Sequence, residues 1–199
     1  MLSVPNPTAA HDGLPDRRVA LARAGDEGAF SELVREHQHM IHALTYRMTG
    51  SAEDAADLAQ ETFVKAWQRL GSFRGDSSFA TWVHRIALNL CLNWRQRSER
   101  SRQLHDGLEM EARTASALSG DIAGVEAERS RRVHEALQRL SAPDRAAVVL
   151  TVFEGLNHAQ AARQLDCAET TVSWRVWTAR RKLRKWLSDL GPEGPEVSL

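Results

Sequence analysis

A strip of positive charge near the end of the chain is the feature of the sequence that most clearly points to chemistry. Residues 172–187, VSWRVWTARRKLRKWL, hold six basic side chains and no acid, with three tryptophans among them. The whole chain is neutral, with 26 Lys and Arg against 26 Asp and Glu, so the strip is a local excess. Cations beside aromatic rings suit the binding of phosphates and bases. The alternative is a solvated charged face whose tryptophans are covered by another part of the chain.

Helical geometry divides the strip into two faces. At 100° per residue, one face is apolar and consists of Val172, Val176, Ala179, Leu183, Trp186 and Leu187. The opposite face carries hydroxyls, cations and two tryptophans: Thr170, Ser173, Trp174, Trp177, Thr178, Arg181, Arg184 and Lys185. On the strip alone, nucleic-acid binding and a solvated face remain equally open.

The residues before the strip favour DNA binding. Asn157 and Gln160 resemble a capping box at the start of a short helix. Asp166 can make the turn that follows, because Asp tolerates the left-handed backbone conformation better than most residues. Ala162 is small, as a tight helix crossing requires, and Val172 is apolar, as needed to hold the second helix on the first. The pattern predicts a helix-turn-helix whose second helix enters the major groove.

Two kinds of DNA contact are expected from this second helix. Base edges or thymine methyl groups are within reach of Thr170, Thr171, Trp174, Arg175 and Thr178. Phosphates are the expected partners of Arg180, Arg181, Lys182, Arg184 and Lys185.

The elements that position these side chains are expected to be helices throughout, since β-branched and aromatic residues are sparse beside Ala, Leu, Arg and Glu. Periodicity and capping residues predict helices over 16–24, 30–48, 51–70, 78–100, 129–140, 141–153, 157–165 and 168–187. Residues 101–128 lose the apolar stripe and hold two basic side chains against six acidic ones. The sequence therefore predicts an all-α protein of two small domains, 16–100 and 129–187, with a disordered segment at 1–15, a flexible linker at 101–128 and a tail at 188–199.

The first predicted domain offers two candidate surfaces. In the helix after Ser51, the apolar stripe is Ala55, Ala59, Phe63, Ala66 and Leu70. Leu58 falls on the opposite, acidic face, either as an incidental exposed leucine or as the centre of a docking surface. Further on, Phe73, Phe79 and Trp82 bracket a Gly/Ser/Asp loop. They suit stacking on unpaired bases, although their spacing also fits a core stripe.

Other classes of function find little support. His39 and His42 lie on one helical turn, but no third ligand has suitable spacing, so we expect no metal. The sequence has no phosphate-binding loop, nucleophile elbow or HExxH motif, so neither an enzyme nor a cofactor is expected. No apolar run approaches the ~20 residues of a membrane span, and the first residues do not form a signal peptide. Two cysteines without a CxxC pattern are typical of a reduced, cytoplasmic chain.

Two long stretches resemble the extracytoplasmic function (ECF) group of bacterial sigma factors. DAADLAQETFVKAWQRLGSFRGDSSFATWVHRIALNLCLNWRQR, residues 54–97, resembles the second conserved region of that family. LSAPDRAAVVLTVFEGLNHAQAARQLDCAETTVSWRVWTARRKLRKWL, residues 140–187, resembles the fourth. The resemblance implies a monomeric subunit that binds core RNA polymerase, recognises −10 and −35 promoter DNA and starts strand opening. It also implies an anti-sigma protein that clamps the two domains.

The resemblance assigns roles by position. The stretch that docks on the polymerase clamp matches Asp54, Leu58, Gln60, Glu61 and Phe63, with Asp57 on the same acidic face. The segment for −10 recognition and melting matches Phe73, Arg74, Asp76, Ser77 and Asn89, with Arg85 on the same basic helix; Asn89 lies near the expected pocket for a flipped base. Geometry and resemblance together give the −35 set: Thr170, Thr171, Ser173, Trp174, Arg175, Thr178, Arg180 and Arg181.

Several positions depart from the family's usual residues. Other residue types are common in place of Thr170, Ser173, Trp174 and Asp166 and of the stretch 158–160, so the promoter sequence does not carry over from relatives. The alternative function is a helix-turn-helix repressor or activator that binds paired half-sites as a dimer. The sequence shows no obvious dimerisation helix for such a protein.

Overall fold

The computed structural model describes residues 16–104 and 125–188, and within these ranges the regular structure is helical. The described residues form two compact units. One consists of residues 16–46 and 53–104, and the other of residues 47–52 and 125–188. The predicted N-terminal segment 1–15 lies outside the described residues, as do 105–124 of the predicted linker and the tail from 189.

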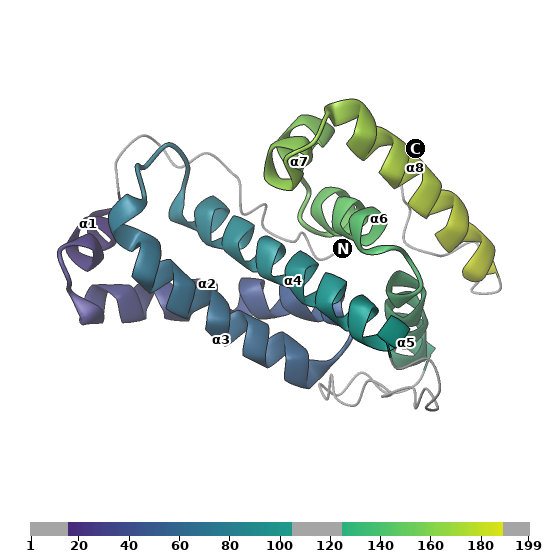
Figure 1. The fold of residues 1–199 in the computed structure, drawn as a ribbon, viewed down its shortest axis with the longest axis horizontal. Helices are drawn as coiled ribbons and strands as arrows, with labels where there is room; N and C mark the ends of the chain where they lie inside the picture. The colour runs from purple at the N-terminus through teal and green to yellow at the C-terminus, as the bar shows by residue number, and fades with distance from the viewer. Residues whose placement is uncertain (1–15, 105–124, 189–199) are drawn as a thin grey trace. The chain divides into compact units, whose positions relative to one another are not determined.

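The first unit is built from α1 (Arg17–Arg23), α2 (Glu27–Thr49), α3 (Ala52–Arg69), the 3₁₀ turn η1 (Leu70–Ser72) and α4 (Phe79–Leu104) (Figure 1). Short polar side chains start two of these helices. Asp26 Oδ1 accepts from Ala29 N at 2.9 Å, and Ser78 Oγ accepts from Thr81 N at 3.1 Å. Because Asp26 caps it, α2 takes in Gly28 and begins before the predicted residue 30.

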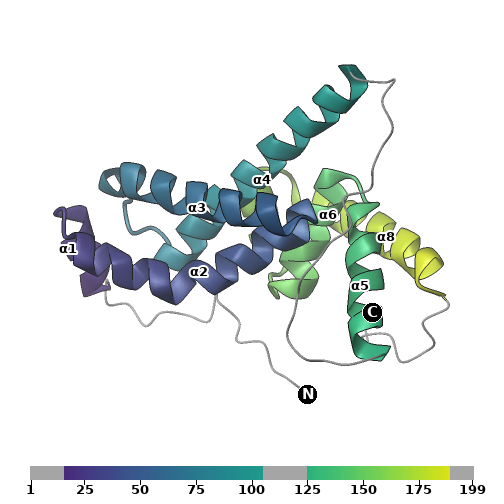
Figure 2. The same cartoon turned by 90° about the horizontal axis from the view of Figure 1, so that it is seen from below.

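The core of the first unit is supplied by several of its helices. The fully buried side chains include Leu33, Ile41 and Leu44 of α2, Leu70 of η1, and Val83 and Leu88 of α4. Phe30 and Trp67 join α2 to α3 with ring centroids 4.8 Å apart, and His37 and Phe79 join α2 to α4 at 5.4 Å. Figure 2 shows the last turns of α4 running on past the ends of α2 and α3.

The second unit is built from α5 (Val125–Gln138), α6 (Ala142–Val148), the π-helical turn η2 (Val149–Phe153), α7 (His158–Leu165) and α8 (Glu169–Trp186). Its core cluster contains Leu137, Leu140, Val148 and Ala179. The first turn of α5 lies in the predicted linker, and the widened η2 turn was not predicted from the sequence.

A buried cation organises the corner between α5 and α6. Arg145 is fully buried, and its guanidinium donates to the carbonyl oxygens of Leu137 at 2.7 Å, Gln138 at 2.6 Å and Leu140 at 3.2 Å. The last carbonyls of a helix have no partner within the helix, so Arg145 supplies the missing donors at the end of α5. This corner fixes α6 relative to α5, and α6 in turn packs against α7 and α8.

Candidate nucleic-acid interface and docking groove

The structure confirms the predicted helix-turn-helix. The capping box at α7 is complete, with Gln160 N donating to Asn157 Oδ1 at 2.8 Å and Asn157 N donating to Gln160 Oε1 at 3.0 Å. Asp166 ends α7 in the left-handed conformation, with φ 50° and ψ 52°. Ala162 and Val172 are both buried, as the crossing of the two helices requires.

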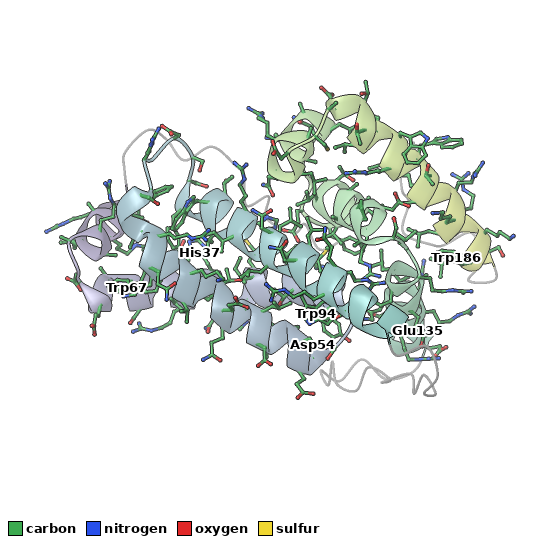
Figure 3. The ribbon with its side chains drawn as sticks, viewed as in Figure 1. His37, Asp54, Trp67, Trp94, Glu135 and Trp186 are labelled. Atoms are coloured by element: carbon green, nitrogen blue, oxygen red, sulfur yellow. The ribbon has the colours of Figure 1, made fainter. Side chains whose placement is uncertain are left out.

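The two faces of α8 are also confirmed. Val172, Val176 and Ala179 are buried, whereas Trp174 and Trp177 are 61% and 59% exposed. The possibility that these two tryptophans are covered by another part of the chain is therefore excluded for the described residues. Trp186 behaves differently: at the C-terminal end of α8 (Figure 3), it packs on the core and lies under the guanidinium of Arg139.

Most of the predicted −35 side chains can be reached by solvent. Thr170, Trp174 and Arg181 are exposed, and the half-buried members of the set are Thr171, Ser173, Arg175 and Arg180. Three basic side chains near the end of the helix, Arg181, Arg184 and Lys185, are also exposed. The guanidinium of Arg181 lies 4.9 Å from the centroid of the Trp177 ring. The exposed face of α8 thus offers cations and large rings together.

Thr178 was predicted to face the DNA groove, and this prediction is wrong. Only 9% of Thr178 is exposed. Lys182, one turn further along the same side of α8, donates to Asp144 Oδ2 of α6 at 3.1 Å. That side of α8 is therefore turned toward α6. In this structure the Lys182 ammonium pairs with Asp144, and its contact with a phosphate stays a prediction.

The Ser173 hydroxyl links the two helices of the motif. Its Oγ donates to the Glu169 carbonyl oxygen at 3.1 Å and lies 2.8 Å from Nδ1 of His158. The hydroxyl thus lies within hydrogen-bond distance of both the Glu169 carbonyl and the His158 ring. Ser173 therefore holds α8 against α7, a role that the sequence pattern did not indicate.

Around the start of α4, the aromatic side chains form core and the polar ones form surface. The Phe73 centroid lies 6.4 Å from that of Phe79 and 5.1 Å from that of Trp82. Phe73 is buried, which favours the alternative of a core stripe, and its contact with melted DNA stays a prediction. The remaining predicted residues of this segment are all exposed: Arg74, Asp76, Ser77, Arg85 and Asn89. The aromatic cluster anchors a polar loop that is free to meet a ligand.

On α3, the predicted docking residues separate in the same way. Asp57, Gln60 and Glu61 are exposed, and Asp54, labelled in Figure 3, is half-buried. Leu58 is only 5% exposed, so its predicted place on the acidic face is wrong. The apolar arc of α3 is wider than the five-residue stripe, because Leu58 and Thr62 also face the core.

A groove between α2 and α3 was missed by the sequence analysis. It has a volume of about 750 Å³, and its lining includes Phe30, Val34, His39, Phe63, Val64 and Trp67. Val64 is 48% exposed, and Trp67, labelled in Figure 3, is 37% exposed, whereas Phe63 is buried, with 9% exposed. The signal in the sequence was the pair Val64 and Trp67, apolar side chains beside the acidic stretch. An open groove of this kind, lined by apolar side chains with polar residues around them, is a candidate site for a partner.

The structure also bears on metal-binding and reactive side chains. They contain no group of three or more His, Cys, Asp or Glu side chains placed to hold a metal ion, and His39 and His42 lie exposed at the groove. Burial raises the pKa of the Cys91 thiol to about 12, so this cysteine is not a thiolate at neutral pH. No helix in the part of the chain that the structure describes is long and apolar enough to cross a bilayer.

Comparisons with known proteins agree with both halves of this arrangement. Residues 33–101 match the model of sigma-70 region 2, and residues 130–183 match that of sigma-70 region 4. The RNA polymerase sigma-H factor of Pseudomonas aeruginosa is 37% identical over 182 residues, covering 86% of this chain and 93% of the relative. The ECF sigma factor SigM of Mycobacterium tuberculosis (strain H37Rv) is 36% identical over 182 residues, covering 90% and 88%.

Two solved structures share the fold. The sigma factor RpoE in complex with the anti-sigma factor NepR from Bartonella quintana matches with a TM-score of 0.67 at 26% identity, over 80% of this chain and 96% of that one. CnrH in complex with the cytosolic domain of CnrY matches with a TM-score of 0.61 at 28% identity, over 88% and 97%. The chain belongs to the ECF group of the sigma-70 family.

Proposed function

We propose that this protein binds core RNA polymerase as a monomer and directs it to specific promoters. One observation carries the proposal: a helix-turn-helix whose second helix exposes two tryptophans and several cations, with its apolar face buried. The family supplies the context in which such a helix reads the −35 element. The role is non-catalytic and belongs to the compartment of the polymerase, the cytoplasm.

The groove between α2 and α3 is the proposed binding site for core polymerase. Val64 and Trp67 supply apolar area that is accessible to a partner helix, and the exposed Gln60 lines the groove beside them. Asp57 and Glu61 are exposed on the same helix and offer charge to the same partner. This moves the centre of the docking surface from Leu58, which is buried, to the groove one turn away.

The −10 element is the proposed ligand of the loop before α4 and of the first turns of that helix. Arg74, Asp76 and Ser77 lie exposed on the loop, and Arg85 and Asn89 lie exposed on one side of the helix. A base flipped from the duplex needs hydrogen-bonding groups of this kind to offset the few kcal/mol that unstacking costs.

An anti-sigma protein is the proposed regulator. One similar structure, RpoE with NepR, is a complex of a sigma factor with an anti-sigma factor, and CnrH was likewise solved with a protein partner, the cytosolic domain of CnrY. A regulator of this class would compete with core polymerase for the chain. Loss of polymerase binding on adding the regulator, measured by co-elution, is the expected result.

Transcription from a genomic fragment pool tests the proposed function. Purified core polymerase is assayed with the wild-type chain, with Trp67→Ala in the groove, or with the paired substitution Arg184→Ala and Lys185→Ala on α8. With the wild type, we expect new start sites that share upstream elements. With either variant, we expect the transcripts from these sites to be absent or far less abundant. Absence of new start sites, together with failure to co-elute with core enzyme, contradicts the proposal. DNA binding by a dimer would then favour the repressor or activator.

A further inference from the structure

The two most exposed large apolar side chains in the described chain stand on the same face of the same helix. Trp174 is 61% exposed and Trp177 is 59% exposed, one turn apart in the first half of α8. Tryptophan is enriched in contact surfaces because its large ring gains much from being covered. A pair left open on a DNA-reading helix is therefore expected to be covered by DNA.

The neighbours of the two rings differ. The guanidinium of Arg181 lies over the Trp177 ring, 4.9 Å from its centroid, within the range of a cation–π contact. Trp174 lies nearer the start of the helix, one turn after the exposed Thr170. In helix-turn-helix proteins the first turns of the second helix meet base edges, while cations further along meet phosphates.

Burial and hydrogen bonding within the second unit reduce the number of α8 side chains that are available to contact bases. Thr178 is buried, and the Ser173 hydroxyl is held by His158 and Glu169. The largest exposed surface left among the predicted base contacts is the indole of Trp174, which is mostly apolar. In the major groove, the apolar feature that distinguishes one base from the others is the 5-methyl group of thymine.

We propose that Trp174 reads the 5-methyl group of a thymine in the −35 element, while Trp177 holds Arg181 against a phosphate. The inference rests on the proposed function and adds the chemical group that is recognised. It separates the two tryptophans into a sequence-reading residue and a positioning residue. The preference of this chain for thymine at that position would therefore come from Trp174.

Selection from duplex pools that differ by this one methyl group tests the inference. Holoenzyme made from core polymerase and the full chain selects from two random libraries, one containing thymine and one containing uracil. With the wild type, one upstream position should prefer thymine in the first pool. That preference should fall about fourfold in the uracil pool, the effect of losing one buried methyl-sized group.

Variants then assign the effect to a side chain. Trp174→Ala should select the same sequences from both pools, whereas Trp174→Phe, which keeps an aromatic face, should retain part of the preference for the methyl group. Trp177→Ala should keep the methyl preference and weaken all promoters alike. Arg181→Ala should do the same and lower the slope of log affinity against log salt by about one. Circular dichroism of each variant checks that the helices are intact.

The outcomes separate the inference from the proposed function. Selected promoters with no preference for the methyl group, or a preference that survives in Trp174→Ala, overturn the inference alone. Failure of the wild-type holoenzyme to select any duplex overturns the proposed function and this inference with it.

Discussion

The helices α3 and α8 have the same length, 18 residues, yet they divide their surfaces differently. In α8 four residues are buried, and a wide face with both tryptophans is left open. In α3 six residues are buried, including Leu58 and Phe63, which were expected to dock on the polymerase. A helix that is enclosed on more of its circumference has less surface for a partner. Its functional side chains are then harder to separate from its core by periodicity alone.

Because of this difference, each aromatic or apolar residue of a family motif has one of two roles: it stabilises the fold, or it binds a partner. In the first unit, the family motif contains side chains that hold the fold, such as Leu58 and Phe73, beside side chains that face outward. In α8, Trp174 and Arg181 face outward, and neither belongs to the core of the second unit. Substitutions at paired buried and exposed positions should therefore separate a loss of stability from a loss of binding.

Phe73→Ala should destabilise the protein by about 3–5 kcal/mol, the range for removing a buried phenylalanine. Phe73 is 7% exposed and packs on Phe79 and Trp82. Denaturant unfolding measures the loss. The control is Arg74→Ala on the adjacent exposed position, which should leave unfolding unchanged and reduce promoter opening. If Phe73→Ala kept its stability and lost only promoter opening, the ring would be a DNA contact after all.

Leu58→Ala should cost about 2–4 kcal/mol of stability, because Leu58 lies in the core of the first unit. Its matched control is Val64→Ala, six residues later on α3, where the side chain is 48% exposed. Val64→Ala should barely change unfolding but should weaken binding to core polymerase. Titration of labelled protein with core enzyme, corrected for the folded fraction, checks both. The reverse pattern would return Leu58 to the docking surface.

Trp67→Ala should weaken the complex with core polymerase about tenfold or more, the cost of truncating an aromatic anchor of an interface. Leu21→Ala on α1 is the control, since Leu21 is similarly exposed, at 40%, and lies outside the groove. Equal losses in the two variants would mean that the groove has no special part in docking.

Much of the fold could be predicted from the sequence because local signals decide it. Asn157, Ser78 and Asp166 act through short-range capping and backbone geometry, and all three do what their types suggest. The buried cation Arg145 was missed because its partners are carbonyl oxygens, which no side-chain pattern reveals. The widened turn η2 likewise has no residue signature that separates it from an ordinary helix.

The prediction of site residues was most accurate on α8, a helix with one buried face and one exposed face. The helical wheel placed Trp174 and Trp177 correctly because α8 has a single apolar stripe. It misplaced Thr178, which lies at the border of the two faces, where the packing of α6 decides the outcome. The groove between α2 and α3 depends on two helices at once, so neither pattern showed it alone.

Thr178→Val gives the smallest expected effect and tests that border directly. The Thr178 Oγ1 is buried and makes no hydrogen bond to any described residue. Replacing the hydroxyl with a methyl of nearly the same shape removes an unsatisfied polar group, so the free energy of unfolding should rise by about 1 kcal/mol. Promoter affinity should stay the same. Thr170→Val, at an exposed position one turn before Trp174, is the matched control and should leave unfolding unchanged. If Thr178→Val weakened promoter binding without stabilising the protein, the open face of α8 would extend past Thr178, and the contrast with α3 would be wider than the burial of Thr178 implies.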